Sequence, residues 1–468
     1  MISLTFFGGI NEIGGNKILL EADDTKLFLD FGMSFRKHGA YFEEYLKPRT
    51  ANGFGDLIEL NLIPKLEGIY REDLLKISKL KIHKKPVIDG LLLSHVHYDH
   101  SASISFLDER IPIYCSSITK IIAKALIESA QRSLETEIYN FKRRPLINPR
   151  EKAIERIFKA IDSEKNFKVG NLDIKPIAVE HSVPGALAYI IYTSEGTILY
   201  TGDFRLNGQS ELTERMVDIA ENKDIDVMLC EGTRIDSKTY DDEKNVKKNS
   251  SQVISKTKGL VVADFAYKDI TRFNTFYEIA KENDRKIAIT FKDAYLYREL
   301  KKINLSLPDI KDKNILLYKR KKATGTYREN DYDFWEREFL NYENTVDADY
   351  IRRAQNEVII CIGFYDINEL IDIKPKKGSV YIHSASEAHN EEQIFDEKRL
   401  ENWLSHFKLP KYHFHSSGHA NGIEIKEIVS KIKPKKLIPI HTEKEKIEIY
   451  RKLIMPYVKE FEVPKLRI

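Results

Sequence analysis

The chain of 468 residues has few of the features that mark secreted, membrane-spanning or disordered proteins. Its three cysteines, Cys115, Cys230 and Cys361, are far apart and provide neither a disulfide framework nor a thiolate metal site. No apolar run reaches the roughly eighteen residues that a membrane-spanning helix requires. The N-terminus has no basic segment ahead of its apolar stretch, which argues against a signal peptide. These absences predict a cytoplasmic protein that does not associate with membranes.

Charge of one sign is not in excess either. The 75 Lys and Arg residues nearly balance the 72 Asp and Glu residues, so any site for a polyanion must be a local patch. Hydrophobic residues make up 42% of the chain, with 24 Tyr and 23 Phe, which indicates a globular protein. The length allows two or more domains with sizeable cores.

Histidine is concentrated in one segment, residues 94–101, which follows the apolar run Leu91-Leu92-Leu93. This pattern is typical of a buried strand that delivers polar side chains into the loop beyond it. In an extended loop His95 and His97 lie on one side and can hold one ion, while Asp99 and His100 are offset toward a second. Imidazole nitrogens with a carboxylate form a donor set that suits a divalent ion such as zinc. Chance enrichment of a polar loop in histidine is a weak alternative.

Four further apolar runs end in side chains of the same kinds. They precede His181, Asp203, Glu231 and His441. Such repetition predicts one site at the rim of one sheet sandwich. Asp30 also lies at the end of a predicted strand, where it can orient a ligating histidine, although a simple turn residue is equally compatible with the pattern.

The pattern changes after residue 235. Segments 259–264, 272–283 and 286–290 alternate as strand, helix and strand, which predicts a parallel α/β subdomain. We therefore expect a first domain part at 1–235, an insertion at 236–408 and a second part of the first domain at 409–468.

Several other segments carry expectations of their own. Residues 131–165 look helical, and their basic residues indicate a solvated face; these are Lys142, Arg143, Arg144 and Arg150. The basic run 319–328 indicates a solvated loop or a path for phosphates. The chain is expected to end in a short strand at 462–468. His38 and His83 have no other possible metal ligand at a suitable spacing in the sequence, so we expect neither to belong to a functional site.

These motifs carry a resemblance to a known family. Asp30, the cluster at 95–100, His181 and Asp203 resemble the ordered metal motifs of the metallo-β-lactamase superfamily. Glu231, His419 and His441 resemble the additional motifs of its β-CASP nucleases. The segment 8–16 is similar to the N-terminal signature of the ribonuclease J group. The resemblance implies an αββα sandwich with an inserted parallel β-CASP domain, in a short form without the C-terminal domain of the bacterial enzymes.

The resemblance also implies roles for individual residues. His95, His97 and His181 would hold one Zn²⁺, and Asp99, His100 and His441 a second, with Asp203 bridging the two. Asp99 would also accept a proton, His419 would bind phosphate or act as general acid, and Glu231 would orient His419. The implied phosphate and RNA contacts are Ser416, Ser417, Gly418 and Ser384.

The implied function is zinc-dependent hydrolysis of single-stranded RNA from its 5′ end toward its 3′ end, by a chain that can form a homodimer. An endoribonuclease or DNA nuclease of the same family is the nearest alternative. A lactonase or thioesterase would not need the segment 236–408, and a non-catalytic scaffold would usually have lost ligands. Two departures from ribonuclease J stand out: Ile362-Gly363-Phe364-Tyr365-Asp366 replaces a Gln-Gly-Glu-Pro segment, and Thr442 follows His441 in place of glycine.

Overall fold

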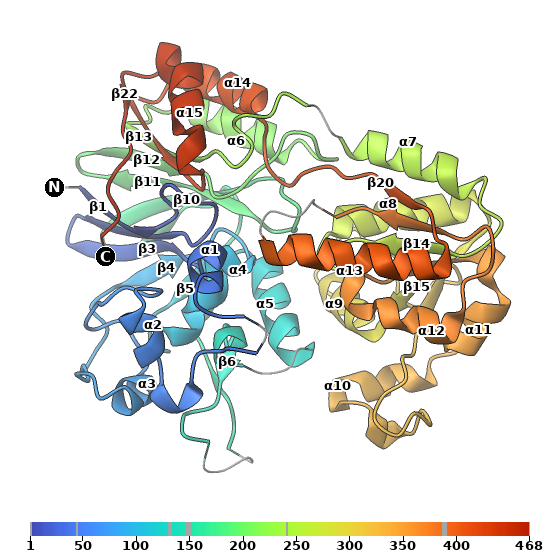
Figure 1. Ribbon diagram of the computed structural model, residues 1–468. Coiled ribbons are helices and arrows are strands. Elements are labelled where there is room, and N and C mark those ends of the chain that lie inside the picture. Colours follow the sequence, from blue (N-terminus) through green and yellow to red (C-terminus); the bar gives the residue numbers. More distant parts are fainter. Residues whose placement is uncertain are drawn as a thin grey trace. The chain divides into compact units, whose positions relative to one another are not determined.

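The chain builds one structural unit, leaves it to build a second, and returns to complete the first (Figure 1). The computed structural model describes residues 2–43, 45–129, 133–146, 151–239, 242–385 and 391–467. The first unit contains residues 1–206, 210–239 and 418–468, and the second contains residues 207–209 and 240–417. The main crossings thus follow Thr239 and Ser417, whereas the sequence placed them after residues 235 and 408.

Two mixed β-sheets form the centre of the first unit. In spatial order, one sheet consists of β1 (Ser3–Gly8), β2 (Lys17–Ala22), β3 (Thr25–Phe31), β4 (Gly90–Leu92), β5 (Ile113–Cys115) and β8 (Phe158–Ala160). The other consists of β22 (Glu460–Phe461), β21 (Lys436–Ile440), β13 (Val227–Glu231), β12 (Gly196–Tyr200), β11 (Leu187–Thr193), β10 (Leu172–Ala178) and β9 (Phe167–Val169). Strands β13 and β21 pair in parallel, so a late segment of the chain completes the early sheet.

Apolar side chains from both sheets meet in one core, which contains Phe6, Ile18, Leu172, Tyr189 and Ile438. A second cluster packs helices on the outer face of the second sheet. These helices are α6 (Leu212–Glu221), α14 (Gly422–Ile432) and α15 (Ile447–Ile454). The remaining helices of this unit are α1 (Phe35–Gly39), α2 (Gly55–Glu59), α3 (Glu72–Ile77), α4 (Tyr98–Ser101) and α5 (Ser117–Ser129). The expected αββα sandwich is confirmed.

The second unit contains one seven-stranded sheet in which every strand pair is parallel. Its spatial order is β17 (Thr345–Val346), β16 (Ile315–Tyr318), β15 (Lys286–Thr290), β18 (Val358–Cys361), β14 (Val261–Asp264), β19 (Val380–His383) and β20 (Lys411–His413). Its helices are α7 (Glu243–Ile254), α8 (Ile270–Glu282), α9 (Phe291–Lys301), α10 (Phe334–Arg337), α11 (Ala348–Arg353), α12 (Leu370–Ile373) and α13 (Glu391–Phe407). The expected parallel α/β fold is confirmed. Within the described residues, no helix has the length and apolar character needed to cross a membrane.

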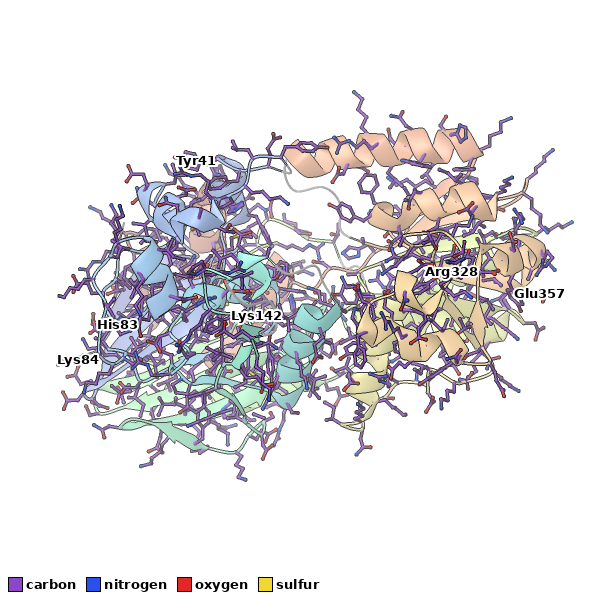
Figure 2. The ribbon with its side chains drawn as sticks, turned by 90° about the horizontal axis from the view of Figure 1, so that it is seen from below. Tyr41, His83, Lys84, Lys142, Arg328 and Glu357 are labelled. Carbon is purple, nitrogen blue, oxygen red and sulfur yellow. The ribbon has the colours of Figure 1, made fainter. Side chains whose placement is uncertain are left out.

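The segment 131–165 is not helical where it is described. It forms a 3₁₀ turn and the short strands β6 (Asn140–Phe141), β7 (Ile154–Glu155) and β8. The guanidinium groups of Arg71 and Arg156 lie 3.6 and 4.9 Å from the centre of the Phe141 ring, and Arg144 pairs with the buried Glu137 at 2.9 Å. The contact with Arg71, which lies outside the segment, and the contacts within the segment take the place of helical hydrogen bonds. Lys142 lies in this region (Figure 2), and Arg150 lies outside the described residues.

Two other expectations need qualification. The basic run 319–328 carries ion pairs within the second unit, because Arg320, Lys321 and Lys322 pair with Asp366, Asp372 and Glu336 respectively. The expected terminal strand at 462–468 is wrong: β22 ends at Phe461, and Pro464 cannot donate to a strand ladder. His38 and His83 make ordinary side-chain contacts, with Glu135 and Asp108, both at 2.9 Å (His83 is labelled in Figure 2).

A fully buried ion pair anchors the second unit and supports a prediction about stability. Arg272 bonds Glu243 at 2.8 and 3.1 Å, and both side chains have no exposed surface. Changing Arg272 to Met removes the guanidinium that faces the buried Glu243 carboxylate, so we expect the free energy of unfolding to fall by about 3–5 kcal/mol. The measurement is urea denaturation. The double variant with Glu243→Gln should recover part of the loss, and a single variant no less stable than the double one would contradict the prediction.

Candidate metal centre

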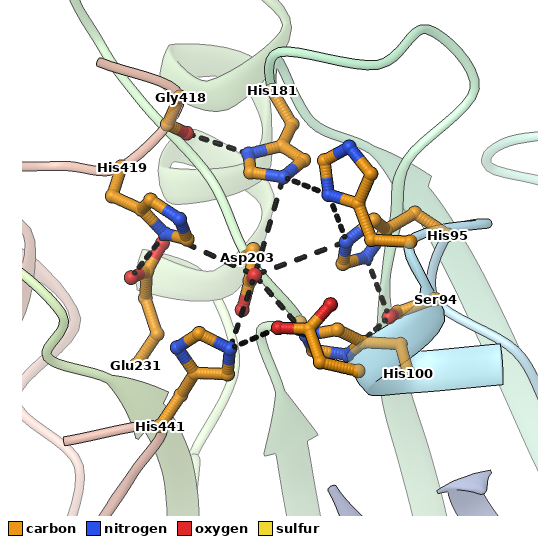
Figure 3. Close-up of polar contacts among 12 residues, drawn as sticks. Ser94, His95, His100, His181, Asp203, Glu231, Gly418, His419 and His441 are labelled. Atoms are coloured by element: carbon orange, nitrogen blue, oxygen red, sulfur yellow. Dashed lines mark hydrogen bonds and ion pairs between the residues drawn. The ribbon is translucent and has the colours of Figure 1, made fainter. Parts of the chain in front are cut away.

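The loops that follow several strands of the first unit bring nine polar side chains together (Figure 3). His95 and His97 lie between β4 and α4, and His181 follows β10. Asp203 follows β12, and His441 follows β21. The remaining four are Asp99 and His100 in α4, Glu231 at the end of β13 and His419 ahead of α14. Strand ends thus deliver side chains from positions as far apart as Asp99 and His441 to one place.

Three imidazole nitrogens form the first possible ligand group. The Nδ1 atom of His97 lies 3.1 Å from Nε2 of His95 and 3.2 Å from Nε2 of His181. Ligand atoms at tetrahedral corners around zinc, about 2.0–2.1 Å from the ion, lie about 3.3–3.4 Å from one another. The spacing of the three nitrogens therefore fits one metal ion.

A second group shares Asp203 with the first. Oδ2 of Asp203 lies 3.1 Å from Nε2 of His100 and 3.6 Å from Nε2 of His441, and Nε2 of His441 lies 3.1 Å from Oδ2 of Asp99. The same Asp203 oxygen lies 3.8 Å from Nε2 of His95. Two buried atoms here, Nε2 of His100 and Oδ1 of Asp203, have no hydrogen-bond partner among the described residues. Such atoms call for a cation in a buried site.

Most of the ligating histidines are held through the ring nitrogen that points away from the centre. Nδ1 of His100 bonds Asp30 at 2.6 Å, Nδ1 of His181 bonds the Gly418 carbonyl at 2.6 Å, and Nδ1 of His441 bonds the Thr233 hydroxyl at 2.8 Å. These contacts leave each Nε2 directed at the centre, which is how supporting residues fix metal-binding histidines. Asp30 thus takes the orienting position that the sequence suggested.

The sequence did not identify the residues that hold Asp30. Tyr200 and Ser94 donate hydroxyl hydrogen bonds of 2.5 and 2.6 Å to Oδ2 of Asp30, and the Ser94 amide donates to Oδ1 at 2.7 Å. Tyr200 is the last residue of a buried strand and looks like core in the sequence. Thr233 was missed as well, although its place two residues after Glu231 in a strand-end loop is a usable signal.

Glu231 and His419 form a pair beside the two groups. Nδ1 of His419 lies 2.9 Å from Oε2 of Glu231, and Glu231 also accepts hydrogen bonds from the Phe204 amide at 2.8 Å and the Thr233 hydroxyl at 2.9 Å. Burial opposes the charged form of His419, but the carboxylates of Glu231 and Asp203 outweigh burial and raise its pKa to about 9. The arrangement fixes the ring of His419 and favours its protonated form.

Electrostatics differ between the two ligand groups. Burial and the neighbouring imidazoles lower the pKa of His95 and His181 well below the ordinary value, which keeps both rings neutral and able to bind metal. Around His100, burial is outweighed by the carboxylates of Asp203, Asp99 and Asp30, which raise its pKa well above the ordinary value. Concentrated negative charge at this point therefore favours a cation.

The four expected phosphate contacts have different surroundings. Ser384 is buried, donates to the Phe414 carbonyl at 2.6 Å and accepts from Arg272 at 2.6 Å, so its hydroxyl is already engaged. Ser416 is also buried, and its carbonyl accepts from Arg272 at 3.3 Å. The Gly418 carbonyl is taken by His181, and a Cβ at Gly418 would lie 2.7 Å from Oγ of Ser182, so that position requires glycine.

Comparisons with known proteins agree with this geometry. Residues 71–249 match the family model described as a beta-lactamase superfamily domain, and residues 407–464 match that of a Zn-dependent metallo-hydrolase RNA specificity domain. The chain is 23% identical over 458 residues to ribonuclease J of Mycoplasma pneumoniae, covering 93% of this chain and 67% of the relative. It is 22% identical over 467 residues to ribonuclease J 2 of Streptococcus pyogenes, covering 97% and 72%.

A solved structure shares the fold across the whole chain. It is a protein of unknown function from Enterococcus faecalis, with a TM-score of 0.74 and 22% identity over 99% of this chain and 98% of that one. The two domain matches occur in the expected order, and the relatives align along nearly the full chain. Together they support the same kind of protein as the geometry of the site does. The chain is a metal-dependent hydrolase with a metallo-β-lactamase fold, and it is similar to the ribonuclease J group of β-CASP proteins along nearly its full length.

Proposed function

We propose that the chain is a ribonuclease that binds two Zn²⁺ ions and degrades single-stranded RNA from its 5′ end. The observation that carries the proposal is the position of Asp203, whose Oδ2 atom lies within 4.0 Å of imidazole nitrogens from both ligand groups. His95, His97 and His181 would hold one ion, and Asp99, His100 and His441 the other. Ions held by these residues would supply an acidified water molecule and positive charge for the oxygens of a phosphodiester.

The protein's own residues supply the proton transfers. Asp99 places a carboxylate beside His441, at 3.1 Å, where it can accept a proton from the attacking water. His419 is fixed through Nδ1 by Glu231, which leaves Nε2 to donate a proton to the departing sugar oxygen. Both carboxylate oxygens of Glu231 accept hydrogen bonds, Oε1 from the Phe204 amide and Oε2 from Thr233 and His419, which fixes the carboxylate against the His419 ring. Glu231 is therefore a positioning residue.

Preference for a 5′ end is the finer part of the proposal. It is supported by Ser416-Ser417-Gly418, which precede His419 and resemble a phosphate-binding stretch. Because the Gly418 carbonyl is occupied, this residue would contribute its amide N–H to a terminal phosphate. A pocket that holds a monophosphate discriminates against a triphosphate through its extra charge and size.

The test compares three RNAs of one sequence: linear with a 5′-monophosphate, linear with a 5′-triphosphate, and circular. We expect mononucleotides from the monophosphate form, slower release from the triphosphate form, and no cleavage of the circle. A single-stranded DNA and a chromogenic ester serve as additional substrates. Cleavage of the circle at a rate like that of the linear monophosphate would show an endonuclease, and hydrolysis of the ester alone would overturn the nuclease assignment.

A further inference from the structure

A small pocket of the first unit is lined by three cationic side chains that the metal centre does not use. They are Lys17 at the start of β2, Lys37 in α1 and Arg467 near the end of the chain. Glu12, Ser34 and Asn61 complete its polar wall, and Phe7, Gly15 and residues 62–64 form the rest. The pocket holds about 360 Å³ of space between atoms, part of it open to solvent.

Lys17 is the unusual member of this set. Only 2% of its surface is exposed, and its side chain lines the pocket without a hydrogen bond from the ammonium group to a described residue. The ammonium lies 5.8 Å from the centre of the Phe31 ring, and Glu12 acts on it only through space. Burial lowers the pKa of Lys17 to about 8, against the opposing effect of the Glu12 carboxylate. An ammonium group that is largely withdrawn from solvent loses hydration, and an anion in the pocket would offset this loss.

The carboxylate of Glu12 does not supply the missing acceptor. Its Oε1 atom accepts from Lys37 at 2.9 Å, and its Oε2 atom accepts from Ser34 at 2.7 Å. Arg467 is held by its backbone, whose amide donates to the Phe6 carbonyl at 2.8 Å, while its guanidinium forms no ion pair with any described residue. Three cations and one carboxylate leave a net charge of +2 (3 − 1) in the pocket.

We propose that this pocket binds a small, doubly charged oxyanion, inorganic phosphate or sulfate, with Lys17 as its central partner. The double charge matches the excess of cationic groups, and the size of the pocket suits a free ion. Lys17 directly follows the loop 9–16, in which Gly9 accepts from the His441 amide at 2.8 Å and Asn16 donates to the Asp99 carbonyl at 3.1 Å. A bound oxyanion thus stabilises a segment that contacts two residues of the metal centre.

The experiment titrates the full chain with phosphate and, separately, with sulfate, and follows heat of binding and melting temperature. We expect saturable binding that Lys17→Met weakens by about tenfold or more, because a charge-assisted contact is lost. Lys26→Met is the matched control, since Lys26 lies in the same hairpin, is exposed and pairs with Glu21. Arg467→Gln, at an exposed position, tests the same pocket if Lys17→Met does not fold.

The number of protons taken up on anion binding is a second measurement. A lysine with a purely structural role would not affect this number. At about pH 9, sulfate should bind with uptake of a proton, because the anion restores the charged form of Lys17 and sulfate itself does not titrate there. Glu12, Lys37 and Arg467 are the other charged groups of the pocket, and Lys17→Met should abolish the uptake while all three remain.

Several results would overturn the proposal. The first is that the wild type shows no saturable binding. The second is that Lys17→Met and Arg467→Gln bind the anion as tightly as the wild type does. The third is that Lys26→Met loses as much affinity as Lys17→Met. Adenosine monophosphate is the comparison ligand. If it binds the Lys17-dependent site more tightly than phosphate does, the occupant is the terminal phosphate of a larger molecule and the assignment to a free ion is wrong.

Discussion

Changing Asp203 to Ala should remove both metal ions, whereas changing His97 to Ala should remove one. The reason is that Asp203 is shared by the two ligand groups, whereas Nδ1 of His97 lies beside His95 and His181 in the first group. We expect either variant to lower phosphodiester hydrolysis by about a thousandfold or more, since each lost ion removes several kcal/mol of charge stabilisation. Metal content and hydrolysis rates are the measurements.

The control for both variants is His406→Ala, which removes an exposed histidine of α13 in the second unit. It should keep the metal content and the activity of the wild type. The far-ultraviolet circular dichroism of the His97 variant should also match the wild type, because His97 lies in a loop at the end of β4. Full metal content in the Asp203 variant would contradict the shared-ligand arrangement.

Changing His419 to Gln should lower kcat by about 10²–10⁴-fold while the metal content stays at the wild-type level. Glutamine can keep a hydrogen bond to Glu231, which His419 makes at 2.9 Å, but it cannot transfer a proton. The measurement is steady-state kinetics on linear RNA together with metal analysis. We expect added imidazole to restore part of the rate in His419→Ala, because a free ring can replace the missing acid.

Glu231→Gln separates positioning from proton transfer. Its amide oxygen can still accept from the Phe204 amide, and its NH₂ group can donate to the Thr233 hydroxyl, so the fold and the metals should be retained. We expect a smaller fall in kcat than in His419→Gln, with KM unchanged, because the ring is still present but less well held. Loss of metal in His419→Gln would instead make His419 a ligand, since its Nδ1 atom lies 3.8 Å from Asp203.

Local patterns in the sequence were sufficient to predict much of the fold. Strand β15 at Lys286–Thr290 coincides with its predicted bounds, and helix α8 at Ile270–Glu282 lies close to the predicted range 272–283, because apolar runs and helical spacing reflect burial directly. The segment 131–165 was mispredicted because its conformation depends on distant partners. Arg71 packs on Phe141 and pairs with Glu137 at 2.9 Å, and neither contact leaves a periodic signal in the sequence.

The candidate site shows the same division. His95, His97, Asp99 and His100 occur within six residues, and His181, Asp203 and His441 each follow an apolar strand, so the sequence alone identified the possible ligands. It could not identify Tyr200 and Ser94 around Asp30, nor Thr233 beside His441, because each partner lies 64 or more positions away. Such contacts exist only once the sheets have paired.

By itself, the sequence determined which chemical groups this protein can bring to a metal centre and which strands carry them, because burial and strand alternation are local properties. The tertiary structure alone decided how those groups meet. Parallel pairing of β13 with β21 places His441 3.1 Å from Asp99, across 342 positions of the chain. It also left Lys17 buried in a pocket without an acceptor, because the Glu12 carboxylate is held by Ser34 and Lys37.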